Sequence, residues 1–219
     1  MLRANSETDP LMAHIARLGD QHERIELESL LEEFGTFDAT LGVGVALIDR
    51  VRATPSALAG LHQETMSVLR GGADVVYQAG FFDGEFHGYA DFLERADGQW
   101  VVSDAKLARQ VRPKALLQLG AYADQLERAG IPLADHARLR LGDGTHLDFP
   151  LSDIAPVFRE RRSRLRELIT EHLSEQLPAE WGDARYVACG RCADCQSAIE
   201  QRRDVLLTAG VRMDQRTKL

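Results

Sequence analysis

Two acids and one amine flank an Asp-Gly dipeptide in the middle of the sequence. Asp91 lies in one strand-like run, and Asp104 and Lys106 lie in the next. Between the runs, Asp97 and Gly98 are typical of a two-residue type I′ turn, which needs positive φ at both positions. Counting outward from that turn, we expect Asp91 and Asp104 to face each other across a hairpin.

Opposed carboxylates on a hairpin need a physical reason, because like charges at that position are destabilising. A divalent cation between them is the natural one, since hard cations prefer carboxylate oxygens. Lys106 lies two residues after Asp104, so both side chains share one face of the strand. The set suits phosphodiester hydrolysis, in which a metal activates water and an amine stabilises negative charge. The alternative is an edge hairpin with solvent-facing charges, because Asp-x-Lys is common by chance.

A second group of candidate ligands lies near the end of the sequence. Cys189, Cys192 and Cys195 have the spacing C-x₂-C-x₂-C, which allows several thiolates to reach one metal centre. Three clustered cysteines do not suggest a disulfide framework.

The surrounding pattern predicts the elements that must position these residues. Asp9 and Pro10 favour a helix start, and Leu11, Ile15, Leu18, His22 and Ile25 recur on one face of that helix. Gly19 would cost helix stability unless something approaches closely there. We expect helices at about residues 10–34, 55–70, 113–130 and 152–176, strands at 74–79, 86–94, 99–107, 137–141 and 146–149, and a strand or loop at 42–48.

Composition excludes few functions. The 219 residues carry a net charge of −8, which argues weakly against coating nucleic acid by charge alone. A basic stretch at residues 159–166 is either a solvated helix face or a phosphate-contacting surface. No apolar run approaches the roughly 18 residues of a membrane span, and the first residues resemble no secretory signal. We therefore expect a cytoplasmic protein without a membrane partner.

Four motifs resemble those of the RecB-like PD-(D/E)xK nuclease family. GYADFL at residues 88–93 and VVSDAK at residues 101–106 are similar to its motifs II and III. GDQHE at residues 19–23 is similar to the G-x-x-H motif of its upstream helix, and QLGAY at residues 118–122 to its Q-x-x-x-Y motif. The four occur in the family's order and cover about residues 10–125.

The resemblance implies a fold and a role for each motif residue. The expected class is α/β, with a restriction-endonuclease-like core at residues 1–180, whose mixed central sheet is flanked by helices, and a C-terminal cysteine segment and tail at residues 181–219. The implied Mg²⁺ or Mn²⁺ ligands are His22, Asp91, Asp104 and the carbonyl of Ala105. Lys106 is the implied catalytic lysine, with Gln118 and Tyr122 contacting DNA phosphate or supporting the active site.

The implied activity is hydrolysis of DNA in repair or recombination, by an exonuclease acting on single strands or ends. A helicase domain or subunit would be a natural partner. One alternative is a catalytically silent nuclease-like module that binds DNA or another protein and carries a cysteine metal site. Another is a cysteine-metal domain without catalysis. The intact set of His22, Asp91, Asp104 and Lys106 argues against a decayed site.

The cysteines resemble those of one branch of this family, which includes bacterial RecB-like nucleases, CRISPR-associated RecB-type exonucleases and the AddB nuclease domain. That branch holds a [4Fe-4S] cluster with three C-terminal cysteines and one upstream of the histidine helix. Here no cysteine precedes His22, and the last spacing is shorter. Either the protein begins upstream of Met1, or another ligand completes the cluster, or the cluster is lost. Two alternatives to the cluster are zinc at the cysteines and cysteines without a metal. The end at Leu219 would suit a fragment of a longer chain.

Overall fold

The computed structural model describes residues 10–175, 180–185 and 187–216. The chain forms two compact units. The core unit comprises Asp9–Arg162, and the C-terminal unit comprises Met1–Thr8 with Ser163–Leu219. The predicted boundary at residue 180 stays a prediction.

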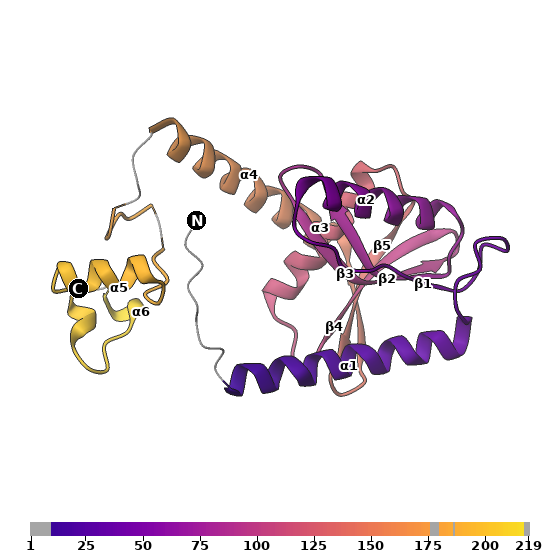
Figure 1. The fold of residues 1–219 in the computed structure, drawn as a ribbon, viewed down its shortest axis with the longest axis horizontal. Coiled ribbons are helices and arrows are strands. Elements are labelled where there is room, and N and C mark those ends of the chain that lie inside the picture. The colour runs from indigo at the N-terminus through magenta and orange to yellow at the C-terminus, as the bar shows by residue number, and fades with distance from the viewer. Residues whose placement is uncertain (1–9, 176–179, 186, 217–219) are drawn as a thin grey trace. The chain divides into compact units, whose positions relative to one another are not determined.

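A six-stranded mixed sheet forms the centre of the core unit (Figure 1). The strands lie in chain order across the sheet: β1 (Val45–Leu47), β2 (Val75–Phe82), β3 (His87–Ala96), β4 (Gln99–Lys106), β5 (Leu133–Leu141) and β6 (His146–Pro150). The β1–β2 and β4–β5 pairs are parallel, and the other three are antiparallel.

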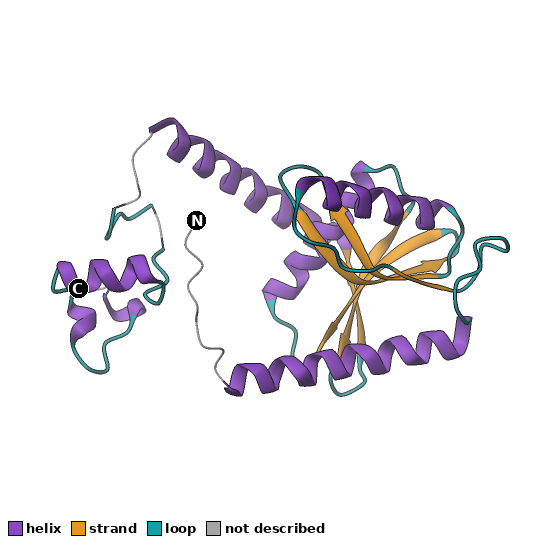
Figure 2. Cartoon of the chain, in the orientation of Figure 1, coloured by secondary structure: helices purple, strands orange, loops and turns teal. Residues whose placement is uncertain are grey.

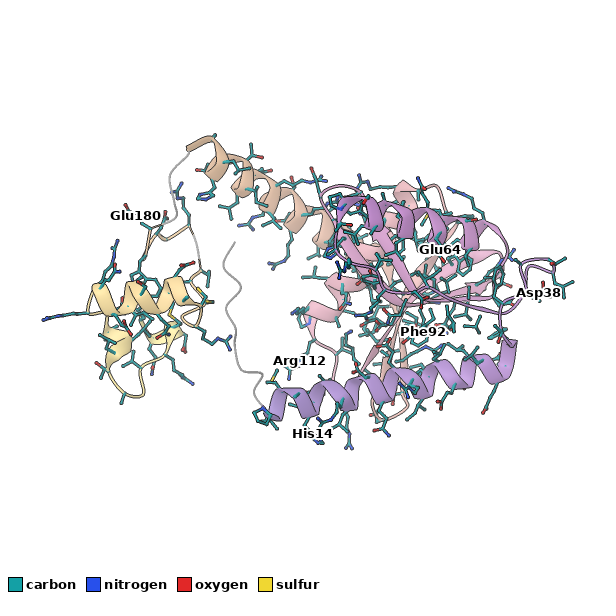
Figure 3. All side chains as sticks on the ribbon, in the orientation of Figure 1. His14, Asp38, Glu64, Phe92, Arg112 and Glu180 are labelled. Carbon is teal, nitrogen blue, oxygen red and sulfur yellow. The ribbon has the colours of Figure 1, made fainter. Side chains whose placement is uncertain are left out.

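Helices cover both faces of this sheet, as Figure 2 shows with the strands in orange. The larger hydrophobic core lies under α2 (Pro55–Arg70) and α3 (Pro113–Arg128), and a smaller one lies under α1 (Pro10–Phe34). Phe92, labelled in Figure 3, belongs to the smaller core together with Leu30 of α1. The predicted α/β class, with a restriction-endonuclease-like mixed sheet flanked by helices, is confirmed.

The β3–β4 hairpin has the predicted turn and register. Asp97 and Gly98 have φ values of 51° and 78°. The paired residues run from Ala96 and Gln99 to Phe92 and Ser103. One position further on, Asp104 pairs in register with Leu139 of β5. The antiparallel ladder with β3 thus ends just before the two acids, while β4 stays paired with β5 as far as Lys106.

Helix α1 begins and ends in agreement with the predicted range, but its buried face differs from the apolar stripe. Leu11, Ile15, Leu18 and Ile25 are exposed, whereas Glu26 and Leu30 are buried. The helical period identified the helix without identifying the side that faces the sheet.

Glu26 is buried because a guanidinium from the sheet compensates its charge. Arg140 of β5, which is also buried, donates from Nη1 to Glu26 (2.6 Å), from Nη2 to Glu94 (2.7 Å) and from Nε to Ser103 (3.1 Å). Its guanidinium also lies over the Phe92 ring. Buried charges are tolerated when they are paired and hydrogen-bonded, so Arg140 fastens α1 to three positions of the sheet.

The first part of α4 (Leu151–Glu175) packs on α3 through a close approach and an ionic cluster. A Cβ added at Gly120 would lie 2.8 Å from Ile154 Cγ2. Arg162 donates to Asp124 (2.6 Å) and Asp83 (2.9 Å), and Arg159 pairs with Asp124 and Glu127. These two arginines of the basic stretch therefore have carboxylate partners within the protein.

The C-terminal unit has a small apolar interior. Besides the end of α4 it contains α5 (Ala193–Gln201), a 3₁₀ turn η1 (Val205–Leu207) and α6 (Met213–Arg216). The hydrophobic side chains buried in its described part are Cys195 and Ile199. Asp204 accepts from Trp181 Nε1 and Arg216 Nε, each at 2.8 Å. Polar contacts therefore carry much of this unit's organisation. None of the described helices combines the length and hydropathy that a membrane crossing requires.

Candidate active site

The structure brings Asp91, Asp104 and Lys106 together where β3 and β4 part. Asp91 Oδ2 accepts the backbone N–H of Ala105 at 3.0 Å, and the two carboxylates are close enough to hydrogen-bond to each other. Lys106 Nζ forms an ion pair with Asp104 Oδ2. The side chain of Asp91 thus takes the place of the next backbone partner in the ladder.

The acid pair is buried and short of positive charge. Burial, followed by the negative charge of Asp104 and a hydrogen bond with it, raises the pKa of Asp91 to about 7. Asp104 is fully buried, and apart from the ion pair with Lys106 neither of its oxygens accepts a hydrogen bond of good geometry from the described residues. Two buried carboxylates with so few donors suit a hard divalent cation, so they fit the Mg²⁺ or Mn²⁺ that the sequence implies.

His22 is not grouped with the acids in this structure. Its Nε2 lies 3.2 Å from the carbonyl oxygen of Arg140, to which it donates in the matching tautomer. Three or more His, Cys, Asp or Glu ligand atoms lie within 4.8 Å of one another only at the cysteines, among the residues described. The bond to Arg140 turns one ring nitrogen toward β5, and Nδ1 is the nitrogen left for a ligand.

Gln118 and Tyr122 lie one turn apart on α3. Gln118 Nε2 donates to the Tyr122 hydroxyl at 3.3 Å. Tyr122 is buried and stacked on Phe81, with ring centroids 5.8 Å apart. Its pKa is raised by burial, and the charges of Asp104 and Asp91 raise it further. The phenol is therefore held in its neutral form, near enough to the acids to sense their charge.

Gly88 explains why this tyrosine can come so close to β3. A Cβ at Gly88 would lie 2.9 Å from Tyr122 Cε1, which is shorter than side chains tolerate without a shift. The first residue of the 88–93 motif therefore has a packing role that the sequence pattern did not reveal.

Three residues that the sequence reasoning missed form a network on the Asp91 side of the acid pair. Gln78 donates to Glu23, and it accepts two hydrogen bonds from Arg50. Burial, and then the charge of Asp91, raises the pKa of Glu23, so this carboxylate lies within reach of the charge of Asp91. The sequence did contain two signals for these residues. Gln78 is an amide inside the otherwise apolar run of β2, and Glu23 is an acid directly after His22.

The three cysteines converge in the C-terminal unit. Their Sγ atoms lie within 4.8 Å of one another, and those of Cys189 and Cys195 are 3.7 Å apart. The Cys189 sulfur accepts the N–H groups of Arg191 (3.4 Å) and Cys192 (3.3 Å). These bonds, Arg191 first, lower the pKa of Cys189 to about 7. Since the thiolate is the metal-binding form, the loop is prepared to bind a metal.

The sulfur spacing suits thiolates that share one metal centre. A single tetrahedral zinc ion, for example, separates its thiolates by about 3.8 Å, and the Sγ atoms of Cys189 and Cys195 are 3.7 Å apart.

Comparison with known families agrees with this fold. The model of the PD-(D/E)XK nuclease superfamily matches residues 9–197. The match covers most of the sequence, so the chain belongs to the PD-(D/E)XK nuclease superfamily. A search of curated proteins found no match. Membership indicates nuclease activity, binding of nucleic acid and the use of divalent metal that is typical of the family.

Proposed function

We propose that this protein is a Mg²⁺- or Mn²⁺-dependent deoxyribonuclease with its catalytic centre at Asp91, Asp104 and Lys106. The observation that carries the proposal is the pair of buried carboxylates with a lysine alongside, in a chain of a nuclease superfamily. Asp91, Asp104 and the Ala105 carbonyl would hold the metal, with His22 as a further ligand through Nδ1.

The residues of the site divide the work of phosphodiester hydrolysis. A bound divalent ion supplies Lewis acidity toward the phosphate and the attacking water. Lys106, one-third exposed beside the fully buried Asp104, orients that water or stabilises charge on the phosphate. Asp91 must lose its proton before it can serve as a ligand. Gln118 and Tyr122 support the substrate as neutral hydrogen-bonding groups.

The test is cleavage of end-labelled DNA with and without Mg²⁺ or Mn²⁺. Asp104→Asn and Lys106→Ala should each lower the rate by about 100-fold or more, as for loss of a key charged group in other enzymes. Asp143→Asn, which alters an exposed loop carboxylate, is the matched control and should cleave normally. Full activity in either site variant would remove these residues from the mechanism.

The finer assignment is an exonuclease acting on single strands or ends in DNA repair or recombination. It rests on the four motifs, and it is compatible with a cytoplasmic location and with a helicase domain or subunit as partner. Linear and circular single-stranded DNA distinguish the modes, because an exonuclease needs an end. Equal cleavage of the circle would show an endonuclease instead.

A second candidate is a silent nuclease-like module that holds nucleic acid or another protein. The observation that favours it is the position of His22, whose ring is bonded to Arg140 and does not converge with the acids. This candidate predicts DNA binding without cleavage at any divalent ion concentration, and titration of Mn²⁺ into the labelled-DNA reaction decides between the two.

For the cysteines we propose a metal centre in the C-terminal unit. The resemblance to the cluster-bearing branch favours [4Fe-4S] with a fourth ligand from outside the described residues, and the 3.7 Å sulfur spacing is compatible with zinc. Anaerobic purification followed by iron, sulfide and zinc analysis separates them. A brown protein with equal iron and sulfide supports the cluster, and a colourless protein with one zinc supports the single ion.

A further inference from the structure

Arg50 lies exposed in the loop that follows β1, with its guanidinium held in place from two sides. Its Nε and Nη2 donate to Gln78 Oε1 at 3.0 and 2.8 Å. Its Cζ lies 5.1 Å from the centre of the Tyr89 ring, and the Tyr89 hydroxyl accepts the N–H of Val51. The side chain is exposed, yet both its edge and its face are fixed.

Both of these partners are neutral. Within the described ranges, Arg50 makes no ion pair, whereas two arginines of β5 do: Arg140 pairs with Glu26 and Glu94, and Arg138 pairs with Asp148. A carboxylate would cancel most of the positive charge at the loop, and an amide or a ring does not. The arrangement therefore keeps a cation in a fixed orientation with no carboxylate in direct contact, while the charge of Glu23 acts on it from beyond the Gln78 amide.

Gln78 connects this cation to the acid pair. It lies opposite Asp91, between the paired positions Tyr77–Phe92 and Ala79–Ala90, and its amide nitrogen donates to Glu23. Arg50 is thus linked through Gln78 to Glu23, and the charge of Asp91 in turn acts on Glu23. A positive charge at Arg50 would offset the repulsion between these acids and a phosphate.

The amide is held there in a strained conformation. Gln78 is buried, with a φ of 56°, and residues other than glycine are disfavoured in this region. Such strain persists where the surroundings require it and is concentrated at functional sites. The bond between Gln78 and Arg50 is consistent with a requirement for this one guanidinium position.

We propose that Arg50 binds a backbone phosphate of the nucleic-acid strand beside the acid pair. A guanidinium has five N–H donors in a planar fork, and Gln78 uses two of them. The remaining donors can meet two phosphate oxygens at once, a geometry that arginine provides and lysine does not. This inference rests on the proposed nuclease function and adds a contact on the substrate.

The test is binding of a fluorescent single-stranded oligonucleotide by anisotropy, without added divalent ion and over a range of salt. Arg50→Gln should weaken binding several-fold at low salt. It should also reduce the slope of log K against log salt by about 0.7, the value for one phosphate contact on a single strand. Arg50→Lys should restore the slope but only part of the affinity.

Arg95→Ala is the matched control. It removes the same charge from an exposed position four residues from Asp91, about 13 Å along the strand, and should leave the slope unchanged. Circular dichroism checks that each variant is folded, and the Lys and Gln variants are compared directly because they differ in charge at similar length.

The outcomes separate the inference from the function on which it rests. If Arg50→Gln binds with the wild-type affinity and slope, Arg50 does not contact phosphate, while cleavage by the wild type still upholds the nuclease. If Arg50→Gln and Arg95→Ala lose equal slope, the effect is general charge and the inference fails. If the wild type neither binds nor cleaves DNA, the proposed function fails first.

Discussion

Asp91 makes the metal-free protein sensitive to pH at the scale of a single residue. Its pKa is raised from 3.8 to about 7 by burial and by Asp104, so between these values the native state binds more protons than the unfolded state. Stability therefore falls as pH rises through this window. Asp91→Asn should remove that fall and be the more stable protein at pH 8.

Urea unfolding at pH 5 and pH 8 without divalent ion measures this effect, with Asp143→Asn as an exposed control. An identical pH dependence in the Asp91→Asn variant and the wild type would mean that the acid is not protonated in the native state. The same proton must leave when a cation binds, so Mg²⁺ affinity measured by calorimetry should rise between pH 6 and pH 8.

The residues of the site differed in how far the sequence could reveal them. The proximity of Asp91 and Asp104 followed from local geometry, because a two-residue turn fixes the register of its own strands. Arg50 and Gln78 come from different elements and meet Glu23 only through tertiary packing. No spacing rule links residues 23, 50 and 78, so their grouping needed the structure.

At the scale of the element, two glycines should respond in opposite directions to the same change. Gly98 has a φ of 78° with open space around it, so Gly98→Ala adds backbone strain and should cost about 1 kcal/mol. Gly19 lies inside α1, and a Cβ there would meet nothing within 4 Å. Gly19→Ala should therefore stabilise the protein by up to about 1 kcal/mol.

Denaturant midpoints of the two variants measure both effects against the wild type. A destabilised Gly19→Ala would indicate that another group packs closely on that part of α1. A close approach of this kind is the reason that the sequence suggested for a glycine inside the helix. A neutral Gly98→Ala would show that the turn can change type without loss.

The elements were predicted better than their buried faces. Proline and glycine signals located α2 and the β3–β4 hairpin, and Thr54 caps α2 through the N–H of Ala57. The apolar stripe of α1 was misleading, since Glu26 is buried and Ile25 is exposed. The burial of Glu26 is explained by its ion pair with Arg140, which lies more than a hundred residues later in the sequence.

At the scale of the whole molecule, the two units should depend on different metals. The C-terminal unit buries few apolar side chains in its described part, and small domains of that kind often need a metal to fold. Removing the thiol-bound metal, or changing Cys189 and Cys192 to Ser, should unfold this unit and leave the core unit intact.

Differential scanning calorimetry should then show loss of one transition while the core transition keeps its midpoint, with the Asp104→Asn variant as the reciprocal control. A single transition that shifts as a whole would mean that the units fold as one. Metal content per chain, measured on the same samples, identifies which change removed which ion.

The way α1 is attached to the sheet predicts how the protein would lose activity on heating. This helix carries His22 and Glu23, yet it rests on a small core and on polar contacts such as Arg140 to Glu26 and Gln78 to Glu23, while β3 and β4 lie between other strands. Thermal fluctuation should therefore release α1 long before the sheet opens. The result is a population that is folded by most spectroscopic criteria and lacks two of the side chains around its acids. Inactivation on heating would precede melting.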